Sequence, residues 1–233
     1  MDTKLPEAIQ KSLAATDKRY KGLLNMSSAM MKAYNGAMYP VDLLAIGIIK
    51  RTISTIHGLK LLVESQNMVC ARTLLRTQID SALRFYAVFL VDDPHDFSLK
   101  VLNGQQINQM EDSSGKLMRD SYLVKKLSKD FPWLKDVYQN LSGYIHFSCS
   151  HIFNAVSPSK TKDNCIDIAI QPIDTKYRTA SWVEVVDCFN ESIDIFAKYL
   201  EGWIITKNNP ELIEKLKNNR TNHFTGPANS AGQ

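Results

Sequence analysis

Arginine and aspartate side chains recur at four-residue steps in the segment from 68 to 91. The members of this row are Arg72, Arg76, Asp80 and Arg84. Residues four apart lie on one face of a helix, so Arg76 is expected to pair with Asp80. One interpretation is that the arginines hold an anion such as a phosphate, with Asp80 fixing their geometry. The alternative is an ion pair on a helix surface that binds no ligand.

A second polar set lies in the segment from 138 to 151. Ser142, His146, Cys149 and Ser150 fall on one side of a helix, at steps of three and four residues. Histidine titrates near neutral pH, so His146 could serve as a general acid or base. A structural histidine, hydrogen-bonded to a neighbouring helix, would explain the same pattern. His146 and Cys149 supply too few ligands for a structural zinc site, so no metal is expected.

The stretch from Arg51 to His57 places a histidine six residues after an arginine. This loose spacing is found in ribonuclease members of the HEPN superfamily, helical bundles that often dimerise around an RNA backbone. Chance alone gives such a match about half the time in a chain with these numbers of arginines and histidines. The pair also lacks the asparagine or aspartate that usually follows the arginine. The spacing by itself therefore predicts no function.

The two polar sets contain two short motifs that occur together. The motifs are Ala71-Arg72-Thr73-Leu74-Leu75-Arg76-Thr77-Gln78-Ile79-Asp80, and Tyr138-Gln139-Asn140-Leu141-Ser142 followed by His146. They resemble a family of bacterial helical proteins of unknown function, in which an arginine and an acid four residues later precede a Tyr-x-x-Leu-Ser-x-x-x-His helix. The acid is usually glutamate in that family, so Asp80 has a shorter reach. The resemblance spans residues 40 to 155, is HEPN-like, and implies a helical bundle with a toxin or antiphage role.

The resemblance implies that Arg76, Asp80 and His146 meet inside the bundle as a catalytic site. His146 would deprotonate a ribose 2′-hydroxyl while Arg76 stabilises the charge on the adjacent phosphate, which cleaves RNA without a metal. Three further residues are expected to bind the ligand beside them: Arg72, Ser142 and Tyr138.

Two other interpretations of the same residues stay open. In the first, the arginine, aspartate and histidine form a buried network that fixes the register of the helices, and the protein is a non-enzymatic interaction module. In the second, a nucleotide or another small ligand binds in a cleft lined by the arginines. Both differ from the nuclease hypothesis because they assign no proton transfer to His146.

Composition removes several classes of function. The chain has 233 residues, of which 44% are hydrophobic and 22% charged, and its net charge of +4 neither requires nor excludes nucleic acid. The four cysteines lie far apart, and no glycine-rich phosphate loop, Gly-x-Ser-x-Gly elbow or His-Glu-x-x-His pair is present, so no cofactor is expected. No secretory signal is visible, and no apolar stretch approaches the roughly 20 residues of a membrane span. These features predict a cytoplasmic protein without a membrane partner.

The candidate side chains must be positioned by helices, because apolar residues recur at helical spacing over most of the sequence. Apolar spacing predicts helices over residues 5–34, 41–66, 68–91, 94–110, 132–156 and 181–207, with a short one before Phe131. The fold class is therefore all-α, an antiparallel bundle of about five to seven helices, with one short strand or hairpin near residues 164–171. Residues 1–210 are expected to form one domain, and 211–233 a short charged helix and a flexible tail. The apolar face of the last long helix is the expected surface of a homodimer.

Overall fold

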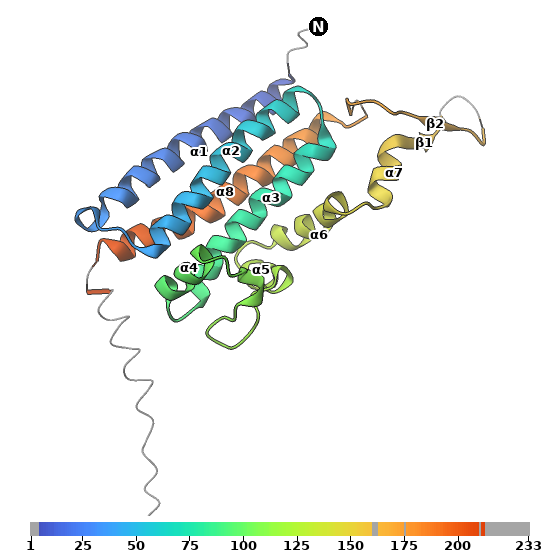
Figure 1. Ribbon diagram of the computed structural model, residues 1–233. Helices are drawn as coiled ribbons and strands as arrows, with labels where there is room; N and C mark the ends of the chain where they lie inside the picture. Colours follow the sequence, from blue (N-terminus) through green and yellow to red (C-terminus); the bar gives the residue numbers. More distant parts are fainter. Residues whose placement is uncertain (1–4, 160–162, 175, 210, 213–233) are drawn as a thin grey trace, which may run out of the picture.

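Four long helices form a bundle in the computed structural model, which describes residues 5–159, 163–174, 176–209 and 211–212 (Figure 1). They are α1 (Glu7–Lys32), α2 (Pro40–Glu64), α3 (Met68–Ala87) and α8 (Thr179–Lys207). Short turns make α1, α2 and α3 successively antiparallel. Helix α8 runs parallel to α1, since Arg19 contacts Asp194 and the later Met30 contacts Lys207. The predicted all-α bundle is confirmed.

Smaller elements connect α3 to α8 and lie outside the four-helix bundle (Figure 1). They are α4 (Pro94–Leu102), α5 (Asp120–Leu127), α6 (Trp133–Ile145), α7 (Cys149–Ala155), β1 (Val156–Pro158) and β2 (Ile166–Ile168). Three short 3-10 turns lie at Ala33–Gly36, Val88–Leu90 and Ile107–Gln109. Helix α6 packs against α3 and carries the chain back along it, which allows α8 to run parallel to α3.

Local signals in the sequence determine where several of these helices begin and end. The Asn67 side chain accepts a hydrogen bond from the Cys70 amide at 3.0 Å and caps α3. Asp93 caps α4, with Pro94 at its first position, as the sequence predicts. The predicted extension of α4 to residue 110 is wrong, because the chain turns at Gly104, whose φ of +91° ends the helix.

The helix predicted over residues 132–156 is two helices with a break between them. Helix α6 ends at Ile145, and His146 is extended, with φ −105° and ψ 145°. Ser148 starts α7: its side chain accepts from the Ser150 amide and donates to the Gly143 carbonyl at 2.7 Å. A side chain at position 143 would meet the Ser148 hydroxyl at 3.1 Å, so glycine favours this close return of the chain. The break moves His146 off the helix face on which the sequence placed it.

The core lies between the long helices. Phe85 of α3 packs edge-on against Phe196 of α8, with ring centroids 5.1 Å apart, and both side chains are fully buried. Burial of a side chain of this size contributes about 1.5–3 kcal/mol. The apolar stripe of α8, which includes Phe189 and Ile193, is buried in the same core. It is therefore used inside the bundle and is not available for the predicted dimer surface.

A fully buried ion pair joins the ends of three long helices. Lys207 at the end of α8 donates to Asp42 in the first turn of α2 at 2.8 Å, and both side chains are inaccessible to solvent. Lys207 also donates to the Met30 carbonyl of α1, at 2.9 Å. The indole of Trp203 and the amide of Tyr39 donate to the same Asp42 carboxylate, at 2.7 and 2.8 Å. Each oxygen of Asp42 is thus hydrogen-bonded, which burial of a charge requires.

The strand predicted near residues 164–171 is confirmed, and its partner lies in the same chain. Strand β2 pairs antiparallel with β1, with Ser157 opposite Asp167. Of the predicted tail, residues 213–233 lie outside the described residues. None of the helices in the described ranges is both long enough and apolar enough to cross a membrane.

Candidate functional site

The contact between α3 and α6 is built from two arginine–tyrosine pairs. In one, the Arg76 guanidinium carbon lies 3.9 Å from the centre of the Tyr138 ring, and Arg76 donates to the Tyr138 hydroxyl. Arg76 and the Tyr138 hydroxyl also both donate to one Asp120 oxygen, at 3.0 Å each. Burial raises the pKa of Tyr138 to about 12, so its hydroxyl remains a donor at neutral pH. The predicted proximity of Arg76 and Tyr138 is present.

The sequence predicted that Asp80 pairs with Arg76, but Asp80 pairs with two other arginines instead. Its oxygens lie 2.9 Å from Arg84 in the next turn of α3 and 3.0 Å from Arg51 of α2. An acid that precedes a base by four residues is the favoured order in a helix, which suits the Asp80–Arg84 pair. Arg76 instead faces α5 and α6, where Asp120 supplies its counter-ion.

Asp120, the first residue of α5, joins Arg76 and Arg84. Burial acts to raise the pKa of Asp120, but the charge of Arg84 and hydrogen bonds from Arg84, Tyr138 and Arg76 outweigh it and lower the pKa. The carboxylate is therefore ionised at neutral pH. Together with the Arg51–Asp80 contact, three arginines share two aspartates in one connected network. Each of the three arginines is paired with at least one aspartate, although the Nη1 atom of Arg84 is buried without a hydrogen-bond partner among the described residues.

Arg72 differs from these arginines because its contacts in the described part of the chain are with aromatic rings and not with aspartates. It donates to the Tyr144 hydroxyl, and its guanidinium carbon lies 4.6 Å from the Tyr144 ring centre and 5.1 Å from that of Tyr177. Burial and the hydrogen bond with Tyr144 raise the pKa of Tyr177, so this ring stays neutral. Across the described part of the chain, no carboxylate lies within ion-pair distance of Arg72. Among the described residues, Arg72 is therefore held in place by aromatic rings and not by an ion pair.

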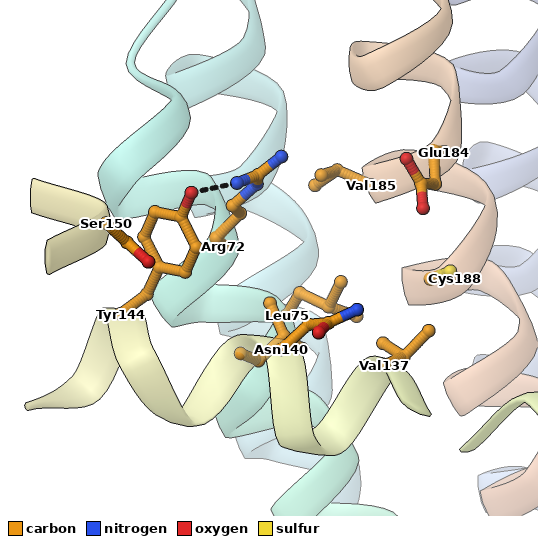
Figure 2. Close-up of a pocket in the computed structure, with 10 residues that line it drawn as sticks. Arg72, Leu75, Val137, Asn140, Tyr144, Ser150, Glu184, Val185 and Cys188 are labelled. Atoms are coloured by element: carbon orange, nitrogen blue, oxygen red, sulfur yellow. Dashed lines mark hydrogen bonds between the residues drawn. The ribbon is translucent and has the colours of Figure 1, made fainter. Parts of the chain in front are cut away.

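Arg72 opens onto a pocket between α3, α6 and α8 (Figure 2). The cavity has a volume of about 280 Å³. Its polar lining residues are Arg72, Asn140, Tyr144, Ser150, Glu184 and Cys188, and its apolar ones are Leu75, Val137, Leu141 and Val185. Figure 2 shows Glu184 on the α8 wall, across the pocket from Arg72 on α3. The pocket thus offers a cation and a carboxylate on facing walls, with apolar side chains between them.

Cys188 on the α8 wall is not a reactive group in this setting. Burial, with help from nearby acids such as Glu184, raises the pKa of its thiol to about 11. The thiol is therefore protonated at neutral pH and adds a small, weakly polar surface to the pocket.

His146 lies apart from the arginines with which the sequence grouped it. It is exposed at the end of α6, and its ring makes no hydrogen bond to any residue that the structure describes. Ser142, the third predicted ligand-binding residue, directs its hydroxyl to the Tyr138 carbonyl of its own helix, at 3.0 Å. The predicted meeting of Arg76, Asp80 and His146 is therefore wrong. One cause is the direction of α6, which places Tyr138 at Arg76 and Tyr144 at Arg72, so that position 146 lies beyond both arginines. The break between α6 and α7 then turns the chain at His146.

A different histidine, His151, contacts the tyrosine that binds Arg72. The ring of His151 in α7 lies 5.7 Å from the ring of Tyr144, which in turn contacts Arg72. Its Nδ1 accepts the Ser148 amide at 3.3 Å and so acts as part of the α7 cap. In the HEPN-type spacing, Arg51 donates to Asp80 and His57 is exposed on α2. Among the described residues, no three histidine, cysteine or acidic side chains converge as metal ligands.

Comparisons of the chain with protein-family models, with curated proteins and with solved structures give no match. Of the expected ligand-binding residues, Arg72 lies in the pocket, whereas Tyr138 lies in the aspartate network. Tyr144 and Glu184 were not predicted. Tyr144 follows Val137 by seven residues and Asn140 by four, so helical spacing could have indicated it, but Glu184 lies on a helix that only the fold brings near.

Proposed function

We propose that the protein is a non-enzymatic binding module for a nucleotide, whose phosphate is held by Arg72 in the pocket between α3, α6 and α8. The observation that carries this proposal is that the Arg72 guanidinium is held by aromatic rings and has no ion-pair partner among the described residues. A guanidinium fixed between aromatic rings presents its donors in one orientation, so little entropy is lost when it binds a phosphate. The other α3 arginines are less suited, because aspartates already bind them.

The remaining walls fit the other parts of a nucleotide. Glu184 faces Arg72 across the cavity, and a carboxylate there accepts hydrogen bonds from ribose hydroxyls. Leu75, Val137 and Val185 supply the apolar surface against which a base packs. This arrangement favours a ligand that has both a phosphate and hydroxyl donors over inorganic phosphate alone.

The proposal predicts a selective loss of binding in the variant Arg72→Gln. Calorimetric titration of the full chain with AMP, adenosine and inorganic phosphate is expected to show the tightest binding for AMP. Arg72→Gln is expected to weaken AMP binding about 10- to 100-fold, because a hydrogen bond to a charged group is lost. Adenosine binding, which lacks the phosphate, should change little in the same variant.

Arg51→Gln is the matched control, since it removes the same charge from a neighbouring helix outside the pocket. It should bind AMP as the wild type does. Circular dichroism of both variants verifies that the bundle is intact. Equal AMP affinity in wild type and Arg72→Gln, or no binding of AMP to the wild type, would contradict the proposal.

RNA cleavage by His146 stays a prediction of the sequence, and the exposed, unpaired imidazole lends it little support. We expect no cleavage of total cellular RNA by the wild type at neutral pH with EDTA present. We also expect His146→Ala to change the free energy of unfolding by less than about 0.5 kcal/mol, as is usual for an exposed side chain without partners. Cleavage that is lost in a normally folded His146→Ala variant would instead establish the nuclease hypothesis.

A further inference from the structure

The hairpin presents an uncovered apolar face. Ile166, Ile168 and Ile170 alternate along the chain and are 62%, 63% and 90% exposed. The strand register places Val156 opposite Ile168 and Pro158 opposite Ile166, so these five side chains share one face. Figure 1 shows the hairpin at the outer end of the segment that leaves α6, away from the bundle. A contiguous apolar surface of this kind marks an interaction site.

The outer edge of β2 also carries unpaired backbone groups. The Ser159 amide donates to the Cys165 carbonyl at 2.9 Å, and the Ala169 amide donates to the Ala155 carbonyl at 2.8 Å. Odd-numbered residues of this stretch therefore bond to β1. Because alternate residues direct their backbone groups to opposite edges, those of Ile166, Ile168 and Ile170 face outward. In the described residues the sheet has only two strands, so no third strand covers this edge.

We propose that this edge is a dimer interface, in which residues 166–170, that is β2 and the two residues after it, pair antiparallel with the same residues of a second copy about a two-fold axis at Ile168. The two hairpins then form one continuous sheet with a single apolar face. A two-stranded hairpin is marginal by itself, whereas a sheet with more strands and a covered face is stable. The pairing also removes an exposed strand edge, which proteins rarely leave open.

The sequence of β2 is what favours a second copy over another partner. Centred on Ile168, the pairing places Ile166 opposite Ile170 of the partner and Ile168 opposite itself, so every outward backbone group in this stretch meets its complement. Asp167 then lies opposite Ala169 of the partner and not opposite another charge. A pairing centred on Asp167 would set two like charges against each other, which is unfavourable. The apolar spacing is therefore self-complementary in one register.

The substitution Ile168→Asp tests the interface, because it sets two carboxylates against each other on the axis. We expect the full wild-type chain to be a dimer by sedimentation velocity over a dilution series. Ile168→Asp should weaken dimerisation by about 100-fold or more. Ile205→Asp is the matched control, since Ile205 is similarly exposed, at 58%, but lies on α8. It should leave the dimer intact.

A charge-pair variant tests the register. Ile166→Lys combined with Ile170→Glu places each introduced lysine opposite an introduced glutamate of the other copy, so the combination should restore much of the dimerisation lost in Ile166→Lys alone. Circular dichroism checks that each variant keeps its helices. A wild type that is monomeric at all concentrations, dimerisation unaffected by Ile168→Asp, or no rescue by the charge pair would overturn the proposal.

Discussion

Replacement of Lys207 by methionine is expected to lower the free energy of unfolding by about 3–5 kcal/mol, the cost of leaving a buried charge without its partner. Asp42 and Lys207 are both inaccessible to solvent and lie 2.8 Å apart. Methionine retains much of the volume of lysine, so the effect comes from the charge and not from a cavity. The Met30 carbonyl loses its donor as well. Because these contacts join α1, α2 and α8, the loss should appear in one cooperative transition.

Urea unfolding followed by circular dichroism measures this effect. Lys18→Met is the matched control, since Lys18 is exposed on α1, and its substitution should change stability by less than about 0.5 kcal/mol. Asp42→Asn is expected to be destabilising too, because it leaves the Lys207 ammonium buried while Trp203 keeps an acceptor. A loss below about 1 kcal/mol in Lys207→Met would mean that water reaches the pair and that the charge is solvated.

The long helices were predictable because their signals are local. Helix α3 begins at Met68 and α4 at Pro94, where the caps Asn67 and Asp93 stand in the sequence. The break after Ile145 also has a local signal, since the hydroxyl of Ser148 caps α7. Apolar spacing continues through this break, and periodicity alone therefore favoured one long helix. A helix break is therefore difficult to predict where a capping residue lies within a segment whose apolar spacing is helical throughout.

The candidate site was predictable only in part, because its contacts span long distances in the chain. The four-residue spacing placed Arg72 and Arg76 on one face of α3, and the structure has both facing α6. Spacing could not reveal Asp120, which is 44 residues from Arg76 and takes the role assigned to Asp80. In the same way, the sequence shows Lys207 only as a basic residue near a helix end, and it does not reveal the contact with Asp42, which is 165 residues away. Partners of buried charges follow from the topology and not from the local pattern.

A second large effect is expected in the loop before α5, where the Asp112 side chain is inaccessible to solvent. One of its oxygens accepts from the Ser114 hydroxyl at 2.7 Å and from the Ser114 and Lys116 amides at 2.9 and 3.1 Å. The other accepts from Tyr122 and, at 2.9 Å, from Lys126. The carboxylate thus closes the loop and attaches it to α5. Asp112→Ala is expected to lower the free energy of unfolding at pH 7 by about 2–3 kcal/mol, since several buried donors lose a charged acceptor.

This contribution should also depend on pH in a defined direction. Burial acts to raise the pKa of Asp112, but hydrogen bonds from Tyr122, Ser114 and Lys126 outweigh it and hold the pKa well below its usual range. A carboxyl group whose pKa is lowered by folding stabilises the protein fully above its unfolded pKa of about 3.9, and loses that contribution as the pH falls toward the folded value. The stability difference between wild type and Asp112→Ala should therefore be constant from pH 7 to 5 and shrink below about pH 4. Urea unfolding at several pH values measures this stability difference, and Asp187→Ala, at an exposed position, is the control. A stability difference that does not change with pH would mean that the effect comes from packing and not from the ionised carboxylate.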